Sequence, residues 1–210
     1  MVSIDGLRHY VLPNSELAVS MTTMLSEMSD KKHLEKWKKR IGEEEAAKIT
    51  LSASTHGTGY HAMMEDYLNN RLDVNALSHN ELDTFKMSQK MVDRIDNIMF
   101  VEQSLFSEKY RIAGTVDVCA EFDKVPSIID HKTSLRPKKK EWIYNYFLQK
   151  TGYALMLEEL TGIKIEQIVT LISIREPFTE PQIFVEKTET YRAPLIALIE
   201  AYHAKHHTKS

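Results

Sequence analysis

Residues 109–134 read KYRIAGTVDVCAEFDKVPSIIDHKTS, and this stretch decides the fold of the chain. Polar and apolar residues alternate along it, which indicates β-strands whose successive side chains point to opposite faces. We expect a hairpin that turns at Asp123-Lys124, with a second strand over 125–134. The first strand is expected to present Val116, Val118, Ala120 and Phe122 on one face, and Thr115, Asp117, Cys119 and Glu121 on the other.

Three charged residues of this hairpin are candidates for catalysis. Asp130 and Lys132 are two residues apart, so they share a face of their strand, and the turn brings Asp117 towards them. Carboxylate oxygens bind Mg²⁺ or Mn²⁺, and a lysine beside the metal can orient a water molecule or stabilise charge on a phosphate. An isolated Asp-x-Lys is most often an ordinary half-exposed strand. Here the apolar Ile128-Ile129 before Asp130 favours a buried carboxylate that needs a partner.

Upstream of the hairpin the apolar spacing is helical. Residues 1–19 have no clear period, and we expect an irregular arm there. A helical run from Ser20 is expected to break at Ser29-Asp30, and Gly57 and Gly59 are expected to open a second helical segment. A third segment is expected to begin at the cap residue Asn80 and to carry an apolar stripe formed by Leu82, Phe85, Met91, Ile95 and Ile98.

Strands and helices also follow the hairpin. A strand over FVEQSLFS precedes it, a helix over 138–161 ends near Gly162, strands follow in KIEQIVTLISI and PQIFVEKT, and 188–207 is a final helix. This order predicts an α/β (α+β) fold in which helices flank a central mixed sheet. We expect one domain over 1–210, with a helical N-terminal part to about residue 99, a sheet core over 100–187 and a C-terminal helix and tail over 188–210.

Composition excludes several classes of protein. With 210 residues, 42% of them hydrophobic and 27% charged, the chain has the composition of one globular domain. The single cysteine, Cys119, cannot form an internal disulfide or hold an iron–sulfur cluster. The first residues do not resemble a signal peptide, and no apolar run reaches the roughly 20 residues of a membrane span. We therefore expect no membrane partner and a soluble, intracellular protein, in the cytoplasm of a bacterium or phage-infected host, or in an organelle.

Several motifs, in this order, resemble the PD-(D/E)xK nuclease superfamily and specifically its RecB-type branch. They are Gly114-x-x-Asp117, Asp130-x-Lys132 and Gln149-x-x-x-Tyr153, with a helix histidine, His61, upstream in HGTGYHAMMEDYL. Val116 stands where the superfamily name has proline, a departure that is common in this branch. The segments TTML and LEKWKKRIGEEEA look closest to the mitochondrial genome maintenance exonucleases and their phage relatives, and the resemblance spans about residues 20–175.

The resemblance implies a restriction-endonuclease-like core and a role for each matching residue. Asp117 and Asp130 would bind Mg²⁺ or Mn²⁺ together with His61 and the carbonyl of His131. Lys132 would be the catalytic lysine. The residues with supporting roles would be Glu102 and Glu65 beside the metal site and Gln149 and Tyr153 against the nucleic acid.

Some of these residues also have structural interpretations that involve no catalysis or binding. His61 and Glu65 are four apart and could form an ordinary surface pair on a helix. Gln149 and Tyr153 could be a polar rim residue and a core aromatic. Trp37 and Trp142 could stack on bases or belong to the core, and the sequence does not decide between the two.

The net charge of −3 gives no sign of a nucleic-acid partner, but the distribution of basic residues does. Lysines and arginines cluster over 31–40 and 136–140, and the second cluster follows Lys132 closely, where phosphates would pass. Hydroxyl residues before a helix act as caps and also bind phosphate. The residues predicted to contact nucleic acid in these places are Arg136, Lys138, Lys139, Ser20, Thr22 and Thr23.

The preferred hypothesis is a metal-dependent exonuclease that hydrolyses phosphodiester bonds at single-stranded DNA ends. Two alternatives remain open: a structure-specific or double-strand nuclease of recombination and repair with the same catalytic residues, and a DNA-binding module without catalysis. Nothing in the sequence identifies a protein partner.

Overall fold

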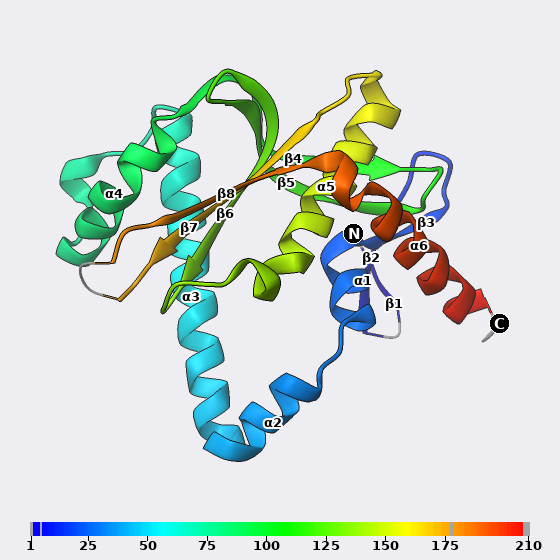
Figure 1. Cartoon of the computed structure of the whole chain (residues 1–210), viewed down its shortest axis with the longest axis horizontal. Helices are drawn as coiled ribbons and strands as arrows, with labels where there is room; N and C mark the ends of the chain where they lie inside the picture. The colour runs from blue at the N-terminus through cyan, green and yellow to red at the C-terminus, as the bar shows by residue number, and fades with distance from the viewer. Residues whose placement is uncertain (1, 5, 177–178, 208–210) are drawn as a thin grey trace.

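The computed structural model describes residues 2–4, 6–176 and 179–207. A central mixed sheet runs through the molecule and helices cover both of its faces (Figure 1). The predicted α/β class with a flanked mixed sheet is therefore confirmed. Within the described ranges, no helix combines the length and the apolar character that crossing a membrane requires.

The predicted hairpin is present and lies at the centre of the sheet. Strand β5 (Ile112–Phe122) and strand β6 (Val125–Ser134) pair antiparallel, and Phe122 lies opposite Val125. The turn residues Asp123 and Lys124 have φ angles of 51° and 67°. Two consecutive positive φ angles are typical of the type I′ turn, whose twist matches that of the flanking strands.

Two edges of strand β5 are used differently. Strand β4 (Ile95–Ser107) pairs antiparallel along one edge for most of its length. The other edge is shared, because β3 (Leu17–Ser20) pairs parallel with Ile112–Ala113 and β6 pairs only from Val118 onward. Between these two partners, residues 114–117 of β5 border an opening in the sheet. On the far side of β6 the sheet continues with β7 (Gln167–Ile174), parallel to β6, and β8 (Gln182–Lys187), antiparallel to β7.

The prediction of an irregular arm over residues 1–19 is wrong. This segment forms strands β1 (Val2–Ile4), β2 (Leu7–Val11) and β3, which extend the sheet beyond β5. The runs are too short to show a period in the sequence. Turns at Gly6 and Ser15, with φ angles of 75° and 67°, fold them back on one another, and the edge of β5 supplies the backbone partner of β3.

The N-terminal helices begin and end partly as expected. Helix α1 (Met21–Met28) and helix α2 (Lys32–Ile41) are separated at Ser29-Asp30, which confirms the predicted break. The prediction that Gly57 and Gly59 open a helix is wrong, because both lie inside helix α3 (Glu43–Leu68). A glycine costs a helix only about 1 kcal/mol, and the surrounding helix formers outweigh that cost. The chain breaks instead at Gly42, whose φ is 89°.

The predicted limits of the third helical segment are also wrong. Helix α4 (His79–Val92) follows a short 3₁₀ turn, η1 (Val74–Ala76), and is capped by Ser78 rather than by Asn80. Ser78 and Glu81 form a reciprocal capping box, which satisfies two backbone donors at once. Ile95 and Ile98 belong to strand β4, because the edge of β5 provides a ladder that the isolated sequence pattern did not reveal.

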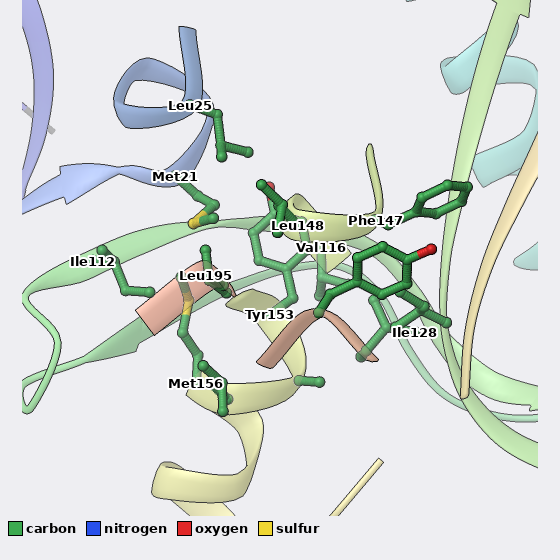
Figure 2. Close-up of a cluster of buried hydrophobic side chains, with 14 of the residues drawn as sticks. Met21, Leu25, Ile112, Val116, Ile128, Phe147, Leu148, Tyr153, Met156 and Leu195 are labelled. Carbon is green, nitrogen blue, oxygen red and sulfur yellow. The ribbon is translucent and has the colours of Figure 1, made fainter. Parts of the chain in front are cut away.

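Two apolar layers sandwich the sheet. On one face pack α1, helix α5 (Tyr144–Thr161), which follows the 3₁₀ turn η2 (Lys140–Ile143), and helix α6 (Thr188–His207). Their shared core surrounds Tyr153 and Met21 (Figure 2). On the opposite face α3 and α4 cover a second core around Phe122 and Ile129. The first half of α3 leaves the sheet and extends with α2 away from the body of the molecule (Figure 1).

Candidate active site at the open end of the hairpin

The two aspartates of the hairpin lie where its strands separate. The β5–β6 ladder ends with Val118 opposite Ile129, one residue before Asp117 and Asp130. The Asp117 carboxylate replaces the next backbone partner, since its Oδ2 accepts the N–H of His131 at 2.9 Å. This bond ties the carboxylate to β6 and fixes its position at the opening of the sheet.

The predicted alternation of β5 fails at this point. Val116 packs in the core beside α5, together with Cys119, whereas Val118, Ala120 and Phe122 pack in the core beside α3 and α4. On the neighbouring strand Glu102 has a φ of 51°, a conformation that is unusual for a residue without turn chemistry. Glu102 lies opposite Asp117 in the ladder, because Val101 pairs with Val118 and Gln103 pairs with Val116. The faces of β5 change between Val116 and Val118, so the assignment of Val116 to the face of Val118 is wrong.

Three side chains from three different elements meet in this opening. Metal-ligating atoms of His61 from α3, Glu102 from β4 and Asp117 from β5 all lie within 4.8 Å of one another. The Nδ1 atom of His61 is 3.2 Å from Oδ2 of Asp117. They line a pocket of about 550 Å³ whose other walls are Gly57, Thr58, Ala62, Glu65, Thr115, Lys132 and Thr133.

The carboxylates of this group carry more negative charge than their surroundings neutralise. Burial, followed by repulsion from Asp117, Glu65 and Asp130, raises the pKa of Glu102 to about 7. Burial and the nearby Asp130 raise the pKa of Asp117, although Lys132 and His61 oppose the shift. Two carboxylates and an imidazole with raised carboxyl pKa values fit a divalent cation, which would relieve this repulsion.

Asp130 is held between two lysines. Its side chain is 1% exposed, its Oδ1 accepts from Lys132 Nζ at 2.6 Å, and its Oδ2 lies 3.8 Å from Lys150 Nζ. Burial alone would raise the pKa of Asp130, but the two ammonium groups outweigh burial and lower it. Burial likewise opposes a charged Lys132, and Asp130 and Asp117 outweigh it and raise the pKa of this lysine. Asp130 and Lys132 therefore form an ion pair at the rim of the opening.

Sequence reasoning missed Lys150. This lysine of α5 is fully buried, donates to the carbonyl of Tyr146 at 2.7 Å, and packs near the rings of Tyr146 and Phe147. Burial lowers its pKa to about 7, against the attraction of Asp130. Its position next to Gln149, inside an aromatic and apolar helix, was the only sequence signal of a buried charge.

His131 contributes its backbone, and its ring is not available to the opening. The imidazole is 2% exposed, and neither ring nitrogen has a hydrogen-bond partner among the described residues. Burial, assisted by the nearby His61, lowers the pKa of His131 to about 3, so the ring is neutral. The carbonyl, predicted as a metal ligand, lies 3.4 Å from Lys132 Nζ and points to the same rim as Asp130.

Gln149 and Tyr153 of helix α5 differ in burial. Gln149 is half-buried and donates to the hydroxyl of Tyr153 at 2.9 Å. Tyr153 is 2% exposed and lies so close to Gly114 that a β-carbon there would come within 2.9 Å of its ring. Tyr153 therefore packs as a core aromatic, as the alternative expected, and its contact with nucleic acid stays a prediction.

The hydroxyl residues before α1 are engaged by an arginine that the sequence did not single out. Arg8 of β2 donates to Ser20 Oγ at 2.8 Å and to Thr22 Oγ1 at 2.7 Å, and Ser20 makes no side-chain cap to the helix. Ser20 is buried, Thr22 is exposed and Thr23 is half-buried. Glu65 lies beside the pocket and pairs with Arg71 at 3.0 Å, whereas His61 contacts Asp117, so the expected alternative of a His61–Glu65 surface pair has no support among the described contacts.

The basic loop after β6 stays at the surface. Arg136 and Lys139 are exposed and Lys138 is half-buried. Trp142, which follows this loop, is 65% exposed, so the core interpretation of this tryptophan is wrong. Trp37 is half-buried on α2, a helix without any fully buried residue.

Comparisons with known proteins add independent information. No family model matches the chain. Two proteins named mitochondrial genome maintenance exonuclease 1 are similar in sequence: that of Xenopus tropicalis is 30% identical over 112 residues, and that of Mus musculus is 26% identical over 110 residues. Each match covers 50% of this chain and 32% of the relative, so the similarity spans about a third of those proteins. This similarity supports a relationship with nucleases.

Two solved structures are also similar. One is a protein of Eubacterium rectale named provisionally as an exonuclease, with a TM-score of 0.47 and 14% identity over 69% of this chain and 63% of that one. The other is the protein SSO0001, with a TM-score of 0.47 and 12% identity over 89% of this chain and 75% of that one.

Proposed function

We propose that the chain is a metal-dependent deoxyribonuclease that hydrolyses phosphodiester bonds at single-stranded DNA ends. The observation that carries this proposal is the convergence of His61, Glu102 and Asp117 within 4.8 Å, beside the Asp130–Lys132 ion pair. The sequence similarity to proteins named as exonucleases supports it. The motif order further supports assignment to the RecB-type branch of the PD-(D/E)xK superfamily.

The donor set fits Mg²⁺ or Mn²⁺. Asp117 and Glu102 would supply hard oxygen ligands and His61 an imidazole nitrogen, which Mn²⁺ accepts readily. Oδ2 of Asp130 is buried and accepts no hydrogen bond from the described residues, so it can turn to the same ion. A bound divalent cation would polarise the phosphate and lower the pKa of a water ligand.

Lys132 has a distinct role in this proposal. Its raised pKa keeps the ammonium protonated at neutral pH, and its Nζ lies at the rim of the pocket. A protonated lysine there can donate hydrogen bonds to a phosphate oxygen and stabilise the charge that develops on phosphorus. Asp130 keeps the ammonium in place through the 2.6 Å contact.

Cleavage of end-labelled oligonucleotides, with and without Mg²⁺ or Mn²⁺, tests the proposal. We expect metal-dependent shortening of linear single-stranded DNA, and a loss of at least about 100-fold in rate for Asp130→Asn or Lys132→Ala. Either variant degrading DNA at the wild-type rate would contradict the assignment of the site.

Substrate topology separates the proposal from its alternatives. An enzyme that needs a free end should spare circular single strands, and a double-strand nuclease should cut a blunt duplex as fast as a linear single strand. Cleavage of circles would contradict the requirement for an end. Binding of DNA without any metal-dependent cleavage would instead support a module without catalysis.

A further inference from the structure

Trp142 has an unusual environment for a tryptophan. Its side chain is 65% exposed, although tryptophan is highly buried on average. It lies in the 3₁₀ turn η2, and the next residue, Ile143, is 1% exposed in the core. The buried neighbour anchors the turn, so the indole is presented to solvent from a fixed base.

The backbone around Trp142 is held on both sides. The N–H of Trp142 donates to the carbonyl of Lys139 at 3.0 Å. Gln182 of β8 accepts the N–H of Lys138 at 2.7 Å and donates to its carbonyl at 3.0 Å. Lys140 pairs with Glu186 of the same strand at 2.5 Å. Because this backbone is held, a ligand that stacks on the indole has to order only the side-chain torsions of Trp142.

The charges near Trp142 favour a polyanion. Lys139 Nζ lies 5.5 Å from the centroid of the Trp142 ring, on one face of the indole. Lys139 and Arg136 are exposed, and neither forms a salt bridge within the described part of the chain. An aromatic face beside unpaired cations is the arrangement with which proteins bind the bases and phosphates of single-stranded nucleic acid.

The exposed tryptophan lies close to the candidate active site along the chain. Tyr146 follows it by four residues, which corresponds to roughly 6–8 Å along a helix axis. The centroid of the Tyr146 ring is 5.3 Å from Lys132 Nζ. The indole therefore lies about one helical turn along the chain from a ring that contacts Lys132.

We propose that Trp142 is a stacking subsite for one unpaired base of a DNA strand whose phosphates contact Lys139 and Arg136. The subsite rests on the proposed function, because it places the strand in the site. Bases of a duplex are already stacked on their neighbours, so the subsite selects single-stranded over paired DNA.

Tryptophan fluorescence tests stacking directly, because the chain has two tryptophans. In the Trp37→Phe protein, Trp142 is the remaining reporter. We measure its emission without divalent metal while adding a short oligo(dT), and then an abasic strand of equal length. The subsite predicts quenching by oligo(dT) but little by the abasic strand, and for Trp142→Ala an affinity for oligo(dT) weaker by about tenfold or more.

Two results would overturn the subsite: equal affinity for the two strands, or oligo(dT) binding without quenching. Trp142→Phe should retain most of the affinity because it keeps an aromatic face. Thermal melting checks that each variant is folded. Metal-free binding is independent of cleavage, so an inactive protein that still shows quenching would contradict the proposed function and not the subsite.

Discussion

The two ends of the β5–β6 hairpin carry the same residue types in opposite environments. At the turn, Asp123 is half-exposed and makes a bidentate contact with Arg94 in solvent. At the open end, Asp130 is buried and Asp117 is half-buried within a group of acids, lysines and histidines. The pKa of Asp123 is lowered by its hydrogen bond to Arg94, whereas burial and Asp130 raise that of Asp117.

The ionised form of Asp123 is therefore favoured by folding, whereas the ionised form of Asp117 is disfavoured. The turn could lose its carboxylate at little cost, because water replaces the partner. The open end keeps acids that repel one another and that raise the free energy of the metal-free protein. Carboxylates with perturbed pKa values are typical of functional sites, where a bound ligand can compensate their charge. Substitutions at the two ends of the hairpin test whether their aspartates differ in this way.

The largest effect is expected from Asp117→Asn. The amide oxygen can still accept the N–H of His131, so the fold is retained, but the charge that faces His61 and Glu102 is lost. We expect the affinity for Mn²⁺, measured by calorimetry on the protein without DNA, to fall by about 100-fold or more. Asp123→Asn, the same change at the other end of the hairpin, should leave the affinity unchanged. An equal loss of Mn²⁺ affinity in both variants would contradict a metal site at the open end of the hairpin.

The next largest effect is expected from Lys150→Met. Methionine fills a similar volume but leaves Oδ2 of Asp130 without the ammonium at 3.8 Å. Removing one partner of a buried ion pair costs about 3–5 kcal/mol, and Lys132 remains, so we expect a loss of about 2 kcal/mol in the free energy of unfolding without metal. With Mn²⁺ the loss should shrink, because the metal charge compensates Asp130. Urea denaturation with and without Mn²⁺ measures both values.

Thr151→Val is the matched control for Lys150→Met. Thr151 is the next residue of α5, is fully buried, and has a hydroxyl without a partner among the described residues. Its substitution should change stability equally with and without Mn²⁺. If the loss in the free energy of unfolding of Lys150→Met is also independent of Mn²⁺, Lys150 contributes to stability only by packing.

The sequence predicted the parts of this contrast that depend on local pattern. The alternation of polar and apolar residues and the Asp123-Lys124 turn were sufficient to predict the hairpin. The two-residue period of a strand was sufficient to predict that Asp130 and Lys132 lie on the same face of β6. Helix ends marked by local chemistry, such as Gly162 after α5, also follow from the sequence.

What the sequence could not supply depends on residues far apart in the chain. Strand β3 forms against an edge that β5 offers, and Glu102 reaches Asp117 because the β4–β5 ladder places the two residues opposite each other. Lys150 is an ionisable side chain and yet buried, which no periodicity predicts, since its partner lies on another element. Pairing across the sheet and burial of charge are tertiary properties.

A smaller effect is expected from Glu102→Gln. Because its pKa is raised to about 7, Glu102 binds a proton more tightly in the folded than in the unfolded chain. Stability of the metal-free protein therefore falls as pH rises from about 4.5 towards 7, and stays lower above that range. Glutamine removes this loss. Allowing for solvent screening of a partly exposed group, we expect the variant to gain about 1 kcal/mol relative to wild type between pH 5 and pH 8.

Glu44→Gln serves as the control for this pH dependence. Glu44 is an exposed carboxylate of α3 that pairs with Lys48 at 2.8 Å. Its variant should follow the wild-type stability profile over the same pH range. Parallel profiles for Glu102→Gln and wild type would show that the acids of the opening do not repel one another as inferred.

Among these charge-removing substitutions the smallest effect is expected from Asp123→Asn at the turn, and Asp123→Ala separates the cost of the lost charge from the cost of backbone strain. Asp123→Asn removes the charge paired with Arg94 but tolerates the φ of 51°, whereas Asp123→Ala also introduces backbone strain. We expect losses of about 0.5 kcal/mol for asparagine and about 1–2 kcal/mol for alanine. Because the pKa of Asp123 is lowered in the folded protein, the asparagine loss should disappear once the pH falls below that lowered pKa, and it should shrink at high salt. An asparagine loss as large as that of Lys150→Met would mean that the two ends of the hairpin are equally dependent on their charges.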